Sequence, residues 1–195
     1  MRKALMVPAV LLLLLSAASA ESRFFLSAGA GYLRPADENY RLVYGNQALY
    51  PEIAAAIRLV GGLCLTGSYG TFKKTGTTPE LGFETTATQT YFTAGLGYLI
   101  RASRILCFEL GGALTGMSFR EDALGAWVKG RQPGYKVEAA LLLVPEDERV
   151  FFGLRAGYIT ARIPDISSEI TGPQPILLGG IRIAVVVGIQ LFGDD

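Results

Sequence analysis

The chain has 195 residues, of which 50% are hydrophobic and only 18% are charged, and its formal net charge is +1. A charge so close to zero excludes the strongly basic class of nucleic-acid-binding proteins. The sequence contains no histidine, which argues against hydrolases, because a Ser nucleophile or an activated water normally needs His as its base. We therefore expect a protein that is not an enzyme and that has neither a cofactor nor a metal site.

The first 20 residues have the order of a secretory signal peptide. Arg2 and Lys3 precede an apolar run from Leu5 to Leu15, and an Ala18-Ser19-Ala20 box follows. We expect cleavage after Ala20, which leaves residues 21–195 as one exported barrel domain. Without Arg2 and Lys3 its formal net charge is −1.

The run from Pro175 to Phe192 decides between two ways of crossing a bilayer. Its length would nearly suffice for a helix and exceeds what one tilted β-strand needs. Val, Ile and Gly dominate it, apolar residues occupy every second position, and Arg182 lies at its centre. On a lone helix this Arg would cost at least about 2.5 kcal/mol in lipid, whereas on a barrel strand it points into the lumen. The run is therefore predicted to be a membrane-spanning strand.

Turn signals divide the mature chain into eight alternating segments, each close to the length of a tilted membrane strand. Short connections alternate with long ones, and the long ones cover residues 34–48, 73–85, 120–134 and 162–175. This asymmetry is typical of bacterial outer-membrane barrels, with both termini on the short-turn, periplasmic side. We predict an all-β, eight-stranded antiparallel transmembrane barrel with short periplasmic turns, long extracellular loops and strands at 23–33, 49–59, 63–72, 86–100, 105–119, 135–144, 150–161 and 176–192.

The period-2 pattern assigns an apolar face of each segment to lipid and a polar face to the lumen. An eight-stranded barrel is only wide enough for its own side chains, so inward charges are expected to be packed and paired. We expect Glu138 to pair with Arg155, and Glu109 to lie near Arg182 or Arg155. A structural plug is favoured over a gated polar path or a proton relay. The predicted lumenal charge cluster consists of Glu52, Arg58, Glu109, Lys136, Glu138, Arg155 and Arg182.

Aromatic residues on the outward face fall into two groups, one near each end of the predicted strands. Two aromatic girdles around an aliphatic belt are typical of membrane barrels, and this regularity was not used to assign the faces. The alternative is a soluble sandwich with these rings in its core, which would leave seven charges on the solvent face. The predicted girdles are Phe24, Tyr98, Phe108 and Phe152 near the short turns, and Tyr32, Tyr69, Phe92, Tyr135 and Tyr158 toward the long loops.

Both cysteines, Cys64 and Cys107, fall on the inward face near the short-turn ends of their strands. The exported compartment is oxidising enough for a disulfide. A whole strand separates the two residues, however, so their Cβ atoms are expected to lie too far apart for a bridge. Two free, buried thiols are the favoured state, with a disulfide as the alternative.

The signal peptide, the eight alternating segments and the Gly-rich first strand (Ala28-Gly-Ala-Gly-Tyr32) resemble the small eight-stranded outer-membrane β-barrel proteins, of the OmpX type and the OmpA transmembrane domain. In that family the final residue is usually an outward-facing aromatic read by the barrel-assembly machinery, whereas here three residues follow Phe192. The resemblance implies a bacterial outer-membrane location and a structural or surface-interaction role through the extracellular loops, without catalysis.

The partners expected from this interpretation are outer-membrane lipid, lipopolysaccharide and the barrel-assembly machinery, with no nucleic acid, an unidentified extracellular partner and a monomeric state. Basic residues at the outer rim, among them Lys73, Lys129 and Arg131, would meet lipopolysaccharide phosphates through charge-assisted contacts. The alternative function is a narrow channel or a carrier for small hydrophobic molecules across the outer membrane. A third possibility is a secreted lipocalin-like binder, which requires the reverse polarity, apolar inside and charged outside.

Overall fold

The computed structural model describes residues 24–79, 82–123, 126–145, 149–166 and 174–191. The predicted signal peptide and Phe192 lie outside these residues. Eight strands and one short helix follow one another as β1 (Phe24–Pro35), α2 (Glu38–Tyr44), β2 (Ala48–Val60), β3 (Leu63–Thr77), β4 (Glu84–Arg101), β5 (Leu106–Ala123), β6 (Ala126–Leu143), β7 (Val150–Ile166) and β8 (Gln174–Leu191).

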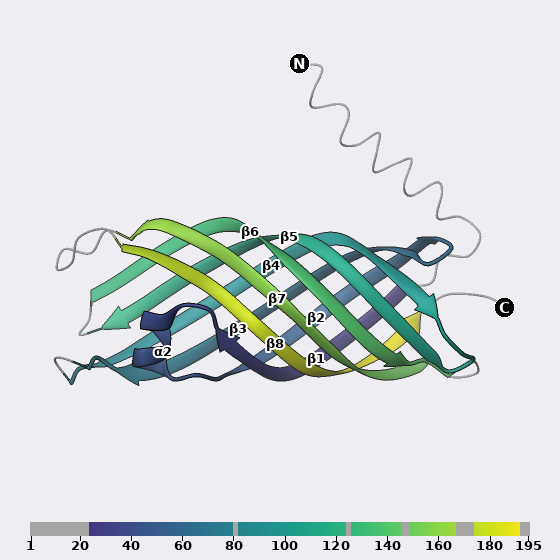
Figure 1. Ribbon diagram of the computed structural model, residues 1–195, viewed down its shortest axis with the longest axis horizontal. Coiled ribbons are helices and arrows are strands. Elements are labelled where there is room, and N and C mark those ends of the chain that lie inside the picture. The colour runs from purple at the N-terminus through teal and green to yellow at the C-terminus, as the bar shows by residue number, and fades with distance from the viewer. Residues whose placement is uncertain (1–23, 80–81, 124–125, 146–148, 167–173, 192–195) are drawn as a thin grey trace, which may run out of the picture.

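The strands form one closed barrel in which each strand pairs antiparallel with its neighbours in sequence and β1 closes on β8 (Figure 1). This confirms the predicted fold class. The connections β2–β3, β4–β5 and β6–β7 lie at one end, which we call the short-turn end, and the start of β1 and the end of β8 lie there too. Helix α2, the ends of β1, β3, β5 and β7 and the starts of β2, β4, β6 and β8 lie at the opposite end, which we call the outer end. Among the described residues, no helix is both long enough and apolar enough to cross a membrane.

The strands at the outer end extend further than the sequence predicted. The prediction of a long loop over residues 120–134 is wrong. Strand β5 runs to Ala123, β6 begins at Ala126, and these two residues are direct cross-strand partners. Likewise β3 runs to Thr77 and β7 to Ile166. Beyond the buried Phe72 and Phe119 the regular apolar–polar alternation stops, but the backbone ladder continues.

The two faces of the barrel wall follow the predicted alternation. Direct partners stay on the same face around the barrel, so Tyr69 and Phe92 both point outward, with exposed fractions of 46% and 62%. Their inward neighbours Ser68 and Thr93 are buried. Apolar side chains therefore cover the outside, and the bore is filled from within.

The bore is layered and is not polar along its whole length, which corrects the expectation of a polar lumen. Near the outer end, buried apolar side chains from several strands pack with Tyr40 and Tyr44 of α2. A second apolar cluster around Phe151, Leu142 and Val186 fills the short-turn end. The six charged side chains that pair with one another lie in the section between these two clusters.

Helix α2 lies at the outer end of the barrel, within a segment that the sequence predicted to be loop. Asp37 caps it by accepting a hydrogen bond from Tyr40 N at 2.9 Å, and its other carboxylate oxygen accepts one from Leu177 N at 3.0 Å. Gly45 ends the helix with φ 84°, a conformation that favours glycine. Both bonds of Asp37 attach α2 to the barrel rim.

Two tyrosines one helical turn apart anchor α2 to the bore. Their rings lie 4.5 Å apart between centroids, and both side chains are buried. Tyr44 Oη donates to Glu121 Oε1 at 2.6 Å and lies 3.0 Å from Thr85 Oγ1. Burial and the hydrogen bond to Glu121 raise the pKa of Tyr44 well above its ordinary value, so this hydroxyl remains a donor. The Tyr40 hydroxyl is buried and has no hydrogen-bond partner among the described residues.

The two tyrosines allow a matched test of how α2 is held. Replacing Tyr44→Phe removes a hydrogen bond to a carboxylate, so local opening of α2 should become easier by about 1.5–3 kcal/mol. Replacing Tyr40→Phe removes only an unpartnered buried hydroxyl and should leave α2 as stable or more stable. Hydrogen exchange of the backbone amides of residues 38–44 measures both changes; equal effects in the two variants would contradict the assigned role of Tyr44.

Candidate functional site

Glu52 of β2 is the centre of a cluster of charged side chains at mid-height in the bore. Its Oε2 accepts from Arg182 Nη1 at 2.5 Å, and its Oε1 accepts from Arg155 Nη1 at 3.2 Å. Lys136 Nζ lies 3.5 Å from Oε2. The carboxylate is therefore shared by three cations that come from β6, β7 and β8, across the barrel from β2.

Glu138 of β6 is the second acidic centre of this cluster. Its Oε1 lies 3.0 Å from Lys136 Nζ, and its Oε2 forms an ion pair with Arg182 and lies 3.7 Å from Arg155 Nε. Glu109 of β5 adds a third carboxylate, with Oε2 at 3.5 Å from Arg155 Nη2. Three carboxylates thus face three cations, so the cluster is neutral and requires no counter-ion.

A glycine makes the ion pair between Glu138 and Arg182 possible. Gly157 of β7 is the direct partner of Glu138 on one side and of Arg182 on the other. A Cβ at this position would lie only 2.9 Å from the Cβ of Glu138. Without a side chain there, the two charged groups meet across the intervening strand.

Polar and aromatic groups add further contacts to the charges, although Arg155 Nε and Arg182 Nε have no hydrogen-bond partner among the described residues. Tyr91 Oη donates to Glu52 Oε2 at 2.9 Å, and Arg182 Nη1 donates to Tyr50 Oη at 3.0 Å. The rings of Tyr50 and Tyr91 stack with centroids 5.1 Å apart and planes inclined by 4°. Lys136 Nζ donates to Ser68 Oγ at 2.9 Å. The cluster therefore involves every strand from β2 to β8, and it crosses the full section of the bore.

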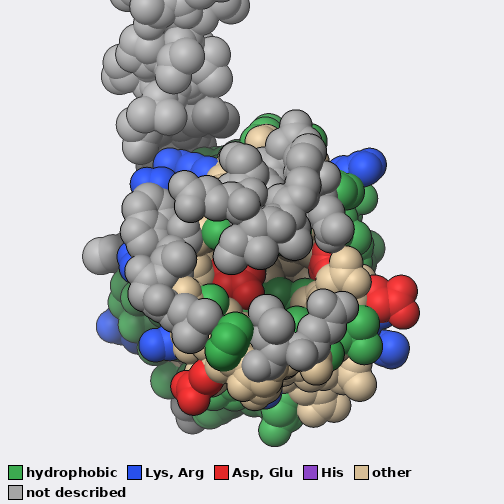
Figure 2. Space-filling model, turned by 90° about the vertical axis from the view of Figure 1, so that its left-hand side faces the viewer, with side chains coloured by type: hydrophobic (Ala, Val, Ile, Leu, Met, Phe, Trp, Pro, Cys, Tyr) green, Lys and Arg blue, Asp and Glu red, His purple; other side chains and the backbone are tan. Residues whose placement is uncertain are grey.

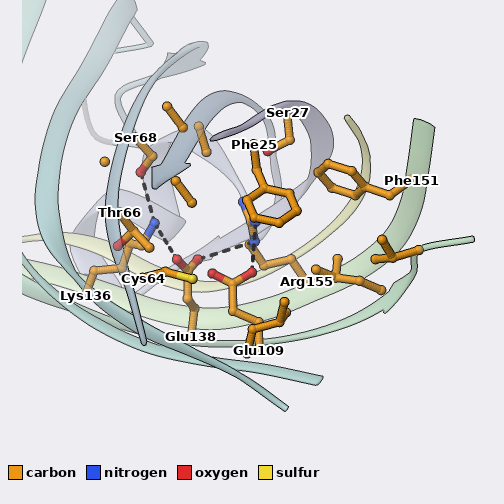
Figure 3. A pocket seen from close by; sticks show the side chains of 17 residues that line it. Phe25, Ser27, Cys64, Thr66, Ser68, Glu109, Lys136, Glu138, Phe151 and Arg155 are labelled. Carbon is orange, nitrogen blue, oxygen red and sulfur yellow. Dashed lines mark hydrogen bonds and ion pairs between the residues drawn. The ribbon is translucent and has the colours of Figure 1, made fainter. Parts of the chain in front are cut away.

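Between the charge cluster and the short-turn end lies a small cavity (Figure 3). Its volume is about 40 Å³ for the centres of water-sized molecules, enough for roughly three waters. Lys136, Glu138 and Arg155 line one side of it, and the Phe25 and Phe151 rings lie on another, 6.1 Å apart. The cavity arises because β2 and β3 contribute only small inward side chains at this level, namely Ala54, Ala56, Cys64 and Thr66.

The charged side chains of the cluster are paired with one another. Buried ion pairs of this density hold their charges in place, because separating one pair leaves an uncompensated charge in a medium of low dielectric. Within the part of the chain that the structure describes, no group of three or more His, Cys, Asp or Glu side chains is arranged to hold a metal ion. Both cysteines are free and buried, and Cys64 lines the cavity.

Six of the seven residues predicted for the charge cluster meet in the bore, and Arg58 does not. Arg58 lies on β2 close to the short turn, where its Nε donates to the carbonyl of Gly61. It faces the same side as its cross-strand partner Cys64, so the predicted face is the one observed. No ion pair joins Arg58 to the other members of the cluster among the described residues.

The residues predicted as aromatic girdles all lie on the described strands. Seven of them are exposed, with exposed fractions between 43% and 64%, and Phe24 and Tyr158 are partly buried. Within the ring near the outer end, Tyr69 and Phe92 are direct cross-strand partners. The buried pair Tyr50 and Tyr91 was not predicted from the sequence. The period-2 alternation would have placed both side chains inward. Tyr50 lies two residues from Glu52 and Tyr91 lies two residues from Gln89, and both of those polar side chains face inward.

The sequence matched no protein-family model, and a search among curated protein sequences gave no match. Solved structures do match. Neisserial surface protein A has a TM-score of 0.62 and 16% identity, over 86% of this chain and 97% of that one. Ail of Yersinia pestis, in a crystal structure with the heparin analogue sucrose octasulfate, has a TM-score of 0.57 and 11% identity, over 88% and 99%.

The N-terminal β-barrel domain of Pseudomonas aeruginosa OprF is similar at a TM-score of 0.51 and 12% identity, over 88% of this chain and 98% of that domain. Identities this low establish the fold alone. The chain has the architecture of the small eight-stranded outer-membrane barrels, as the sequence predicted.

Glu52 contacts three cations and Glu109 contacts one. Neutralising the two carboxylates should therefore destabilise the folded barrel to different degrees. Replacing Glu52→Gln leaves three cations around a neutral amide and should destabilise the folded barrel by about 3–5 kcal/mol. Replacing Glu109→Gln affects one partner, Arg155, at the edge of the cluster, and should have a clearly smaller effect. Urea unfolding in lipid vesicles, followed by tryptophan fluorescence, measures both. Equal destabilisation by the two changes would contradict the central position of Glu52.

Proposed function

We propose that this chain is an integral protein of the bacterial outer membrane that crosses the bilayer as a closed cylinder and has a structural or surface-interaction role at its outer end, without catalysis. The proposal rests on the polarity of the barrel wall, which is the reverse of that in a soluble protein. Large apolar side chains are exposed on all eight strands, whereas Glu52, Lys136, Arg155 and Arg182 are buried in the bore.

The outer wall supports membrane insertion. From Tyr69 to Leu63 on β3 and from Phe92 to Tyr98 on β4, the outward positions carry no charged residue. Exposed apolar residues include Leu114, Leu154 and Val185, with exposed fractions of 77%, 54% and 63%. Soluble monomers rarely expose apolar surface that continues around the whole molecule. Hydrocarbon is the solvent that suits this wall, and a lipocalin-like binder would need the opposite polarity.

The filled bore supports a closed cylinder. Two apolar clusters and the charge cluster between them occupy its section at three heights. Opening a continuous path would require several buried ion pairs to separate together, which is unfavourable without a compensating ligand. The longest connection, residues 36–47 with α2, lies at the outer end, which supports assigning that end to the cell-surface side.

A narrow channel or carrier is the second candidate, and the cavity below the charge cluster is the observation that favours it. The cavity is lined by apolar groups such as Phe25, Leu99 and Leu142 as well as by charges. Its volume of about 40 Å³ is far below the 300 Å³ or more of ordinary ligand pockets. The cavity fits bound water better than a transported molecule.

Membrane insertion is tested by extraction and by gel mobility. The mature protein should stay with the membrane fraction after a carbonate wash, because its apolar wall has no favourable environment in water. In detergent it should migrate differently on a denaturing gel before and after boiling, since an intact barrel resists unfolding at room temperature. A protein that is soluble without detergent and shows no mobility shift would contradict the proposal.

Conductance measured across planar bilayers distinguishes a closed barrel, whose charge cluster blocks the bore, from a narrow channel. The folded protein should produce no steady open level, because the six charges remain paired. Glu138→Ala serves as the comparison, since Glu138 contacts Lys136, Arg155 and Arg182. Steady channels in the unaltered protein that disappear in this variant would support the channel and overturn the plug.

A further inference from the structure

The bore is filled differently on the two sides of the charge cluster. Toward the outer end, the strand side chains of the apolar cluster are at most 3% exposed. In the view onto that end, Lys and Arg side chains lie along the perimeter of the barrel (Figure 2), whereas Lys136, Arg155 and Arg182 are buried in the bore. The described side chains of the outer apolar cluster thus separate these charges from water at the outer end.

Toward the short-turn end, the bore is filled unevenly. The buried members of the apolar cluster there, such as Leu142 and Phe151, lie on β5 to β8 or directly after β6. On β2 and β3, the inward side chains beside the cavity are small and partly exposed, namely Ala54, Ala56 and Thr66. One side of the bore is therefore packed, and the other side retains space for water.

This space extends along β3 from the short turn to the charge cluster. Cys64, Thr66 and Ser68 follow one another on the inward face of β3, and all three line the cavity (Figure 3). Cys64 is the cross-strand partner of Arg58, close to the β2–β3 turn. Ser68 Oγ accepts the hydrogen bond from Lys136 Nζ of the charge cluster. The wall of the cavity therefore connects the short-turn end with the charges.

Two polar groups that line the cavity lack partners in the chain. Arg155 Nε is buried and has no hydrogen-bond partner among the described residues, and its distance of 3.7 Å to Glu138 Oε2 is too long for a hydrogen bond. The Thr66 hydroxyl makes no hydrogen bond to any other residue that the structure describes. An unpartnered buried donor is costly. The cavity is polar on this side and holds roughly three waters, which would supply the missing partners.

We infer that the cavity is a water-binding recess that opens toward the short-turn end, is closed toward the outer end, and holds water bonded to Arg155 Nε and Thr66 Oγ1. The inference rests on the proposed closed cylinder, whose short-turn end faces the periplasm. The charge cluster then exchanges water with one compartment only. Cys64 lies in the recess and is accessible to a water-sized reagent, whereas Cys107 is packed in the apolar cluster.

Silver-ion labelling of two single-thiol variants tests the direction of the opening. Cys107→Ala retains the Cys64 thiol, and Cys64→Ala retains the Cys107 thiol as the matched control. Each mature chain is refolded into lipid vesicles with an N-terminal tag, which lies at the short-turn end because β1 starts there. Cleavage of the tag by external protease shows which end faces outward. In chloride-free buffer, Ag⁺ replaces the thiol proton, and intact-protein mass records the product.

Ag⁺ added at the short-turn side should label Cys64 completely and leave Cys107 unlabelled, and Ag⁺ on the outer side should label neither. Absence of labelling at Cys64, equal labelling of both thiols, or labelling from the outer side overturns the inference. Heat-dependent gel mobility and conductance are recorded on the same samples. A barrel that inserts and does not conduct but shows one of these outcomes overturns this inference alone, whereas steady conductance also overturns the closed cylinder.

Two valine substitutions test whether the recess holds water. Thr66→Val keeps the shape of the side chain but removes a partner of the bound water, so the urea midpoint of unfolding should fall. The control is Thr160→Val, because Thr160 Oγ1 is buried without a hydrogen-bond partner among the described residues. Its midpoint should stay the same or rise. Tryptophan fluorescence in lipid vesicles measures both. A dry cavity would make Thr66→Val behave like the control, and that result overturns the inference.

Discussion

The filling of a narrow bore is the constraint on which the rest of this structure depends. Eight strands enclose a space just wide enough for their own side chains, so every inward residue must fit those opposite it. Glu52 meets this demand by sharing one carboxylate among Arg155, Arg182 and Lys136. Because Glu109 and Glu138 balance the remaining charge, the layer is neutral and holds its groups in a medium of low dielectric. Removing one member therefore affects the partners that remain.

Glycine and large residues alternate across neighbouring strands for the same reason. Gly157 gives Glu138 and Arg182 room to meet, and Gly70 lies beneath the ring of its partner Tyr91. Where small residues face small residues instead, as at Ala54 and Ala56, a cavity is left. The high glycine content of the sequence is thus a consequence of packing across a closed barrel, and the low charge content reflects its apolar exterior.

The period-2 alternation predicted the fold and the two faces because hydrocarbon outside and side chains inside impose it on every strand. It predicted the members of the charge cluster, but the height of each member depends on register and strand tilt, which is why Arg58 lies apart from Glu52. The pattern also failed at the outer end. Residues 120–134 do not alternate between apolar and polar types, so the ladder of β5 and β6 continues there without a hydrophobic signal. The short helix α2 carried readable signals, an Asp37 cap and Tyr40 one turn before Tyr44, but these are common in loops as well.

The extension of the strands changes what kind of surface the outer end presents. A loop that orders on binding loses conformational entropy at that moment, whereas side chains on a paired strand are already in place. On β3–β6 the register aligns Lys73, Arg120 and Lys129 in one row, a spacing that flexible loops would not maintain. The hydrogen-bond ladder that closes the barrel within the membrane therefore also fixes the arrangement of charge just above it. The same backbone geometry thus carries apolar side chains along the middle of the outer wall and cations beyond them.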